Sequence, residues 1–169
     1  IYTPAIPKEN QNLQYYIKNG FNVMKRSEIL EIITQDFFTI AIAGTHGKTT
    51  TTAILAHILQ SCDIDCTAFL GGISVNYNTN FLFSDTSNII VVEADEYDKS
   101  FLKLQPDIAV ITSVDADHMD IYNNATEVKN TFQEFAKKVK NKGVLLVNKN
   151  IDIDFEQPKD GVILTYSAD

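Results

Sequence analysis

The segment GTHGKTT, residues 44–50, carries side chains suited to binding a phosphate group. Gly44 and Gly47 let the backbone turn tightly and approach a ligand without a Cβ in the way. Lys48 supplies a positive charge suited to β- and γ-phosphates, and the Thr49 hydroxyl is suited to ligate magnesium. We therefore predict that this segment binds a nucleotide. The predicted contacts are Gly44, Thr45, His46, Gly47, Lys48, Thr49 and Thr50.

The segment departs from the general phosphate-loop signature at one position. Ile42 stands where the first glycine of that signature belongs, which leaves the shorter motif Gly44-x-x-Gly47-Lys48-Thr49. The alternative interpretation is an ordinary strand-to-helix turn with an incidental lysine. The context favours phosphate binding, because the motif requires a strand before the loop and a helix after it.

Both flanking elements are predicted by the sequence. Residues 37–43 are apolar apart from Thr39, which predicts a strand buried on both faces of a parallel sheet. Residues 49–60 predict a helix whose apolar side consists of Ile54, Leu55, Ile58 and Leu59. The first-turn amides of such a helix have no partner within the helix, and its dipole adds positive charge there. An anion is therefore the natural ligand.

A second group of candidates is the crowded set of acids at residues 93–98. The run NIIVVE, residues 88–93, predicts a buried strand that leads directly into Glu93. In phosphate-loop proteins an acid at the carboxyl end of a neighbouring strand holds the magnesium ion or its water. Glu93 is therefore the predicted metal ligand. For Glu96 and Asp98, taken alone, the sequence favours a solvated acidic loop.

A third group follows the apolar run at residues 107–114, which predicts another buried strand. The DADHMD segment after it, residues 115–120, matches neither an EF-hand loop nor a zinc-protease helix. Because it follows the end of a predicted strand, His118 is expected to lie at the ligand-binding edge of the sheet. A lone histidine is more often structural than functional, so position alone leaves its role open. His57 is expected to be structural or on the surface, and the role of His46 is open.

The remaining elements predict an α/β fold with a mostly parallel, doubly wound sheet. Further strands are expected at residues 65–70, where the Gly71-Gly72 pair ends the strand, and at 21–24, 81–83, 143–147 and 161–164. One helix is expected at residues 9–18. A second is expected to start after Ser27 as its N-cap, and a third is expected to begin at Thr126. The first 36 residues look like the end of a preceding α/β unit and its connection.

Composition and charge narrow the class of protein. The chain has 169 residues and a net charge of -8, which argues against nucleic acid as a partner. No apolar run is long enough to span a bilayer, and no signal peptide is apparent. Cys62 and Cys66 match neither a disulfide framework nor a zinc site, so we expect reduced thiols in a cytoplasm. The chain begins at Ile1 rather than methionine, and we expect it to be part of a longer protein.

Three motifs together resemble the ATP-binding central domain of the Mur ligase family. They are GTHGKTTTT at residues 44–52, EADEYDKSFLKLQPD at 93–107 and ADHMDIY at 116–122. YTPAIP, residues 2–7, is similar to the last strand of the family's N-terminal UDP-binding domain. The resemblance implies that residues 1–36 are the end of that N-terminal domain together with the linker. It also implies that residues 37–169 form an incomplete central domain.

The resemblance also implies an activity. Family members use ATP and Mg²⁺ to form an amide bond through an acyl phosphate. By analogy, Lys48, Glu93 and His118 would be catalytic, and Thr49, Glu93 and His118 would hold metal. The residues on either side of Asp117-His118 resemble those of the member that joins L-alanine to UDP-N-acetylmuramate. A related tripeptide-adding member typically has Phe before this pair and Ala after it, whereas this chain has Ala116 and Met119.

Two interpretations from other classes stay open at this stage. A stand-alone phosphate-loop kinase or NTPase would need a complete active site within these residues. A non-catalytic nucleotide-binding or assembly module would bind ATP and the sugar nucleotide without activity. The family's C-terminal domain contacts the amino acid and the adenine, so we expect the isolated chain not to ligate. The oligomeric state is not predicted.

Overall fold

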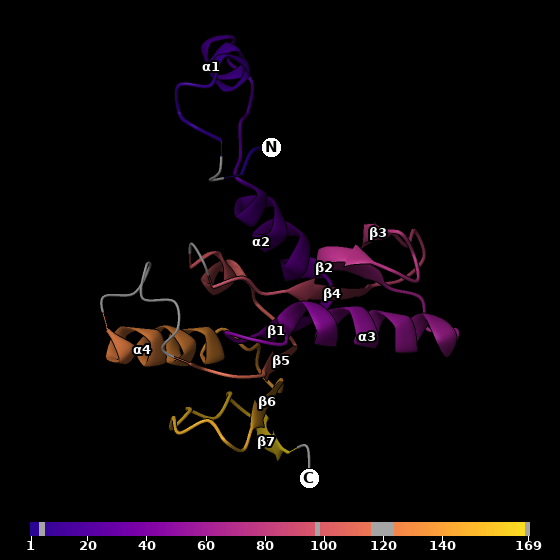
Figure 1. The fold of residues 1–169 in the computed structure, drawn as a ribbon, viewed down its shortest axis with the longest axis vertical. Coiled ribbons are helices and arrows are strands. Elements are labelled where there is room, and N and C mark those ends of the chain that lie inside the picture. The colour runs from indigo at the N-terminus through magenta and orange to yellow at the C-terminus, as the bar shows by residue number, and fades with distance from the viewer. Residues whose placement is uncertain (4–5, 97–98, 116–123, 168–169) are drawn as a thin grey trace.

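The computed structural model describes residues 1–3, 6–96, 99–115 and 124–167 (Figure 1). Within them, seven strands form one sheet in the order β3-β2-β4-β1-β5-β6-β7, with β3 antiparallel to β2 and the other neighbours parallel. The strands are β1 (Phe38–Ala43), β2 (Thr67–Ser74), β3 (Thr79–Leu82), β4 (Ile89–Glu93), β5 (Ile108–Ile111), β6 (Val144–Asn148) and β7 (Val162–Tyr166). This architecture confirms the predicted α/β fold with a mostly parallel sheet.

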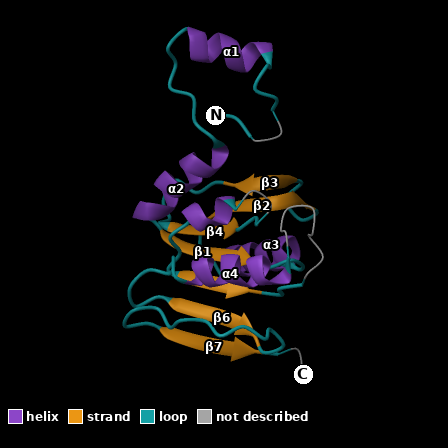
Figure 2. Ribbon diagram, turned by 90° about the vertical axis from the view of Figure 1, so that its left-hand side faces the viewer, coloured by secondary structure: helices purple, strands orange, loops and turns teal. Residues whose placement is uncertain are grey.

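The described residues also form four α-helices and one short 3₁₀-helix. They are α1 (Gln11–Lys18), α2 (Arg26–Asp36), α3 (Lys48–Ser61), η1 (Ser100–Lys103) and α4 (Ala125–Ala136). Of these, α1 and α2 precede the first strand. Figure 2 shows the sheet with helices packed against it, while α1 and the chain start project away from the sheet. The loop at residues 44–47 lies between β1 and α3, at the carboxyl edge of the parallel strands.

Both faces of the sheet are covered, as strand β4 illustrates. Successive residues of a strand point to opposite faces. Ile90 and Val92 belong to the larger apolar cluster, which includes α4 residues, whereas Val91 belongs to a second cluster with Ala56 of α3. All three strand residues are at most 1% exposed. A doubly covered central strand explains why its sequence is continuously apolar.

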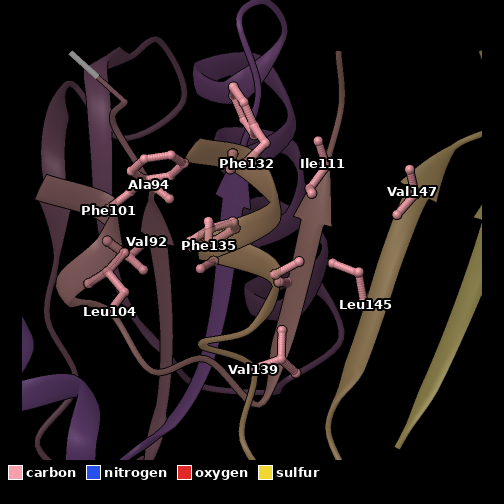
Figure 3. Packing of buried hydrophobic residues seen from close by; sticks show 14 of the residues in the cluster. Val92, Ala94, Phe101, Leu104, Ile111, Phe132, Phe135, Val139, Leu145 and Val147 are labelled. Carbon is pink, nitrogen blue, oxygen red and sulfur yellow. The ribbon is translucent and has the colours of Figure 1, made fainter. Parts of the chain in front are cut away.

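Three phenylalanine rings lie at the centre of the larger cluster (Figure 3). Phe101 of η1 stacks on Phe135 of α4 with ring centroids 4.8 Å apart, and it meets Phe132 edge-on at 5.4 Å. All three are at most 1% exposed. The segment that follows β4 is therefore fixed to the sheet by η1, which bears on the acids at residues 93–96.

Strand β2 differs from its prediction. It begins at Thr67 and continues through Gly71 and Gly72 to Ser74, where the sequence predicted an end at the glycine pair. The reason is β3, which pairs antiparallel with β2 and supplies hydrogen-bond partners beyond the glycines, with a register shift between Phe69 and Ser74.

The apolar side predicted for the helix after the loop was correct only in part, since Leu55 and Leu59 pack against the second apolar cluster. Ile54 and Ile58 of α3 are 53% and 51% exposed, whereas Thr52 and Ala56 are completely buried. Small side chains let a helix lie close to a sheet, and the Thr52 hydroxyl satisfies its own hydrogen bond by donating to the Lys48 carbonyl over 2.8 Å. Close contact with the sheet, rather than hydrophobicity alone, selects the buried face.

The N-terminal segment contains less regular structure than predicted. Residues 21–24 form no strand; an isolated bridge joins Tyr2 and Lys25 instead. Helix α2 begins at Arg26 with Lys25 as N-cap, not Ser27, and the Glu28 carboxylate accepts a 2.7 Å hydrogen bond from the Lys25 amide. That hydrogen bond lowers the pKa of Glu28. Leu30 and Ile33 of α2 pack against the larger apolar cluster.

Two further expectations concern membranes and thiols. Among the described residues, no helix combines the length and apolar character needed to cross a membrane. Cys62 is exposed and Cys66 buried, and neither forms a disulfide in this structure. Burial raises the pKa of the Cys66 thiol.

Candidate nucleotide-binding site

The loop between β1 and α3 has the backbone shape that its glycines permit. Gly44 has φ of +140° and Gly47 has φ of +82°, both in the region that favours glycine. A Cβ on Gly44 would collide with the Thr112 side chain and lie 2.9 Å from the Ser113 amide nitrogen. The loop can therefore lie this close to the end of β5 only if residue 44 is glycine.

Hydrogen bonds from the segment after β5 hold the loop in place. The Thr45 amide donates to the Ser113 carbonyl over 3.0 Å, and the His46 amide donates to the Ser113 hydroxyl over 2.8 Å. The Thr112 hydroxyl donates to the His46 carbonyl over 2.6 Å. Sequence reasoning missed these anchoring residues, which lie 66 to 68 positions away from the loop residues they contact.

Two predicted loop contacts also reach Asp115. The Thr45 hydroxyl donates to Oδ2 of Asp115 over 3.1 Å, and Nδ1 of His46 lies 3.3 Å from the same oxygen. The side chains of His46 and Asp115 are 62% and 54% exposed. His46, whose role the sequence left open, thus presents its ring at the solvent-facing side of the loop.

Lys48 is the first residue of α3 and its ammonium folds back under the loop. Nζ donates to the Gly44 carbonyl over 2.6 Å and lies 3.0 Å and 2.9 Å from the two carboxylate oxygens of Glu96. Glu96 is 3% exposed, so the predicted solvated acidic loop is wrong at this residue. The physical reason is η1, whose Phe101 enters the core and carries the preceding segment inward. Asp98 lies outside the described residues.

Thr49 and Glu93 meet at the edge of the sheet, as the metal prediction requires. The Thr49 hydroxyl donates to Oε1 of Glu93 over 3.0 Å, and the Gly71 amide of β2 donates to Oε2 over 2.8 Å. A Cβ on Gly71 would collide with this carboxylate. The Gly71-Gly72 pair, which predicted a strand end, was the sequence signal that could have located this contact.

The Thr49–Glu93 pair fits a magnesium ion. Hydroxyl and carboxylate oxygens are the ligands that Mg²⁺ prefers, and in nucleotide sites it is held by one or two carboxylates together with phosphate oxygens and water. The described residues contain no group of three or more His, Cys, Asp or Glu side chains placed to hold a metal ion. The pair therefore suits an ion that arrives with a nucleotide.

Of the predicted site residues, one cannot be placed. His118, with its neighbours Ala116 and Met119, lies outside the described residues. The structure brings together Gly44, Thr45, His46, Gly47, Lys48, Thr49 and Glu93; Thr50 follows in the first turn of α3. His57 lies exposed on α3 with Nδ1 3.0 Å from the Tyr77 hydroxyl, which confirms a surface position.

Residues 42–169 match the family model of the Mur ligase middle domain. The chain is 46% identical over 169 residues to a UDP-N-acetylmuramate–L-alanine ligase of Porphyromonas gingivalis, covering 100% of this chain and 37% of that one. It is 49% identical over 171 residues to a protein of the same description from Flavobacterium johnsoniae, covering 99% of this chain and 38% of that one.

The fold is also similar to a solved structure, that of a UDP-N-acetylmuramate–alanine ligase from Thermotoga maritima. The TM-score is 0.75 at 25% sequence identity, and the match covers 88% of this chain and 34% of that chain. In each of these matches the chain spans less than two fifths of the other protein's length.

Proposed function

Since the chain belongs to the Mur ligase family, we propose that it supplies the ATP-binding part of a ligase that joins L-alanine to UDP-N-acetylmuramate in peptidoglycan precursor synthesis. The relatives that support this substrate pair match 100% and 99% of the chain, at 46% and 49% identity. In the same proposal, residues 1–36 end a UDP-binding domain with its linker, and residues 37–169 belong to the central domain.

The observation that carries the proposal is the meeting of Lys48, Thr49 and Glu93 at one edge of the sheet. Lys48 and Thr49 begin α3, where free helix amides and the helix dipole favour an anion. Glu93 arrives from β4, in register with Ile42 of β1, and contacts Thr49 over 3.0 Å. A cationic loop beside a hydroxyl–carboxylate pair suits a nucleotide triphosphate with a magnesium ion.

The proposed reaction is an acyl transfer in two steps. The carboxylate of the sugar nucleotide attacks the γ-phosphorus of ATP, which forms an acyl phosphate and releases ADP. The amine of L-alanine then attacks the acyl carbon, which forms the amide and releases phosphate and a proton. The bound magnesium ion would supply positive charge to the β- and γ-phosphate oxygens, held by Thr49 and Glu93.

Residues of the chain itself would also stabilise the charge that develops during the reaction. Lys48 and the loop amides stabilise the negative charge that builds up on phosphate oxygens as the bond to the leaving group breaks. The hydrogen bonds from Thr112 and Ser113 preset the loop, so little reorganisation is needed when the nucleotide binds. His118 is proposed to ligate or orient a metal ion near the acyl phosphate.

A groove next to Thr49 offers space for the carboxylate end of the acyl substrate. It has a volume of about 290 Å³ and lies between the first turns of α3 and the end of β2, with Thr49, Thr50, His57 and Gly72 in its lining. A carboxylate in this groove would approach the phosphate loop from the side of the Thr49–Glu93 pair. The free thiols fit the cytoplasm, where we place the reaction.

The test is a phosphate-release assay on the protein in its full native length. With ATP, Mg²⁺ and UDP-N-acetylmuramate, we expect release to depend on L-alanine and the amide product to appear by mass spectrometry. Phosphate release without an amino acid would point instead to a stand-alone NTPase. ATP binding without turnover under any combination of substrates would point to a non-catalytic module.

A further inference from the structure

Glu96 is a buried carboxylate for which neither the sequence motif nor the proposed metal site gives a role. It lies three positions after Glu93, and its side chain is 4% exposed beside the 12% exposed side chain of Lys48. Burying a carboxylate costs several kcal/mol unless an opposite charge and hydrogen bonds compensate it. The Lys48 ammonium supplies that compensation, with 2.9 Å and 3.0 Å between Nζ and the two carboxylate oxygens.

The hydrogen bonds of the Lys48 ammonium group fix its orientation. An ammonium group has three donors. The Gly44 carbonyl, from the loop itself, accepts one over 2.6 Å, and Glu96, from the segment after β4, accepts another. Among the residues that the structure describes, these are the two hydrogen-bond partners of Nζ. Within the described part of the chain, this leaves one donor of the ammonium for a ligand.

We propose that Glu96 is a positioning residue, which holds the Lys48 ammonium under the loop so that its remaining donor faces the nucleotide phosphates. Without Glu96, the flexible lysine stem would have to be ordered when the nucleotide binds, and that loss of rotamer freedom would weaken binding. The inference rests on the proposed function, because it assumes that the loop binds a nucleoside triphosphate.

The same contact has an opposite interpretation that experiment can separate. If Glu96 instead competed with phosphate for the ammonium, its removal would free Lys48 and tighten nucleotide binding. A positioning role predicts the reverse. The sign of the change in ATP affinity therefore decides between a carboxylate that presents the lysine and one that withholds it.

The experiment compares the parent protein with Glu96→Gln by calorimetric titration of ATP with Mg²⁺, in the full native length. Glutamine keeps an acceptor oxygen of similar size but removes the charge. We expect ATP to bind the variant on the order of tenfold more weakly. Glu134→Gln, an exposed glutamate of α4, makes the same change in net charge and should bind ATP like the parent.

A double variant separates positioning from a merely structural role. If Glu96 acts through Lys48, then adding Glu96→Gln to Lys48→Arg should weaken ATP binding by less than it does in the parent, because coupled effects are not additive. A full, additive loss in the double variant, or unchanged or tighter binding in Glu96→Gln, would overturn the inference. Absence of ATP binding by the parent would instead refute the proposed function itself.

Discussion

The Thr49 hydroxyl donates a hydrogen bond to Oε1 of Glu93 over 3.0 Å, across 44 positions of sequence. Thr49 lies in the first turn of α3, which follows β1, and Glu93 is the last residue of β4. Strands β1 and β4 are parallel, so both residues lie at the same edge of the sheet. Parallel pairing of β1 with β4 is what brings the two predicted magnesium ligands together.

Replacing Glu93 by glutamine should weaken magnesium binding at the nucleotide site. The side-chain oxygen can still accept from Thr49, but the charge that attracts the cation is gone. We expect the affinity for Mg²⁺ in the presence of ATP to fall by on the order of tenfold or more, measured by calorimetry. Glu9→Gln, an exposed glutamate before α1, is the matched control, and equal affinities in the two variants would contradict the assignment.

Replacing Gly71 by alanine should have a similar effect without touching an ionisable group. The added Cβ would collide with the Glu93 carboxylate, which must then leave its 2.8 Å contact with the residue 71 amide. We predict weaker Mg²⁺ binding in the presence of ATP. In Gly72→Ala the closest atom would be Cγ2 of Thr49 at 3.4 Å, which is an ordinary contact, so this variant should bind the ion nearly normally.

Replacing Phe101 by alanine should destabilise the fold strongly. The ring is 1% exposed and contacts Phe132 and Phe135, and losing a buried phenylalanine typically costs about 3–5 kcal/mol of unfolding free energy. Urea denaturation measures this cost. Phe83→Ala, at a side chain that is 73% exposed, should change the unfolding free energy far less. A small cost for Phe101→Ala would argue against the packing seen in Figure 3.

The Asp65 carboxylate predicts a dependence of stability on acid. A hydrogen bond from Ser84, with others from Gln60 and Thr86, lowers its pKa from the ordinary value of 3.8. Because the folded pKa lies below the unfolded one, the unfolded state binds more protons between them, and stability rises with pH there. The contribution is present above about pH 4 and disappears as the pH falls through the lowered pKa.

Asp65→Asn should therefore be less stable than the parent at neutral pH, because its uncharged side chain accepts weaker hydrogen bonds. The difference should shrink as the pH falls below the ordinary carboxyl pKa. Thermal melts of the two proteins between neutral pH and pH 3 measure it. A difference that stays constant over this range would show that the carboxylate charge does not contribute.

The central strands could be predicted because burial on both faces leaves a continuous apolar run, as in β1 and β4. The face of α3 could not be predicted in the same way. Ile54 and Ile58 look like a buried pair by hydrophobicity, but the sheet lies so close that Thr52 and Ala56 occupy the contact. Local sequence does not encode how closely two elements approach, so the periodicity indicated the helix and only part of its buried face, Leu55 and Leu59.

The candidate site shows the same division between local and long-range information. The loop, Lys48 and Thr49 form one contiguous motif, and Glu93 follows an obvious strand, so these could be identified. Glu96 could not, because nothing in its spacing distinguishes it from the acids around it. Its burial depends on Phe101, whose entry into the core carries the segment toward Lys48, 48 positions earlier.

The most direct test of the central claim is calorimetric titration of ATP with Mg²⁺ into the parent protein and Lys48→Ala. We expect binding in the parent and its loss, or a drop on the order of a hundredfold, in the variant, since the ammonium makes charge-assisted contacts with phosphate. Lys8→Ala, which removes an exposed lysine outside the loop, should bind like the parent. Equal affinity in the parent and Lys48→Ala would contradict the assignment of this loop as the nucleotide site.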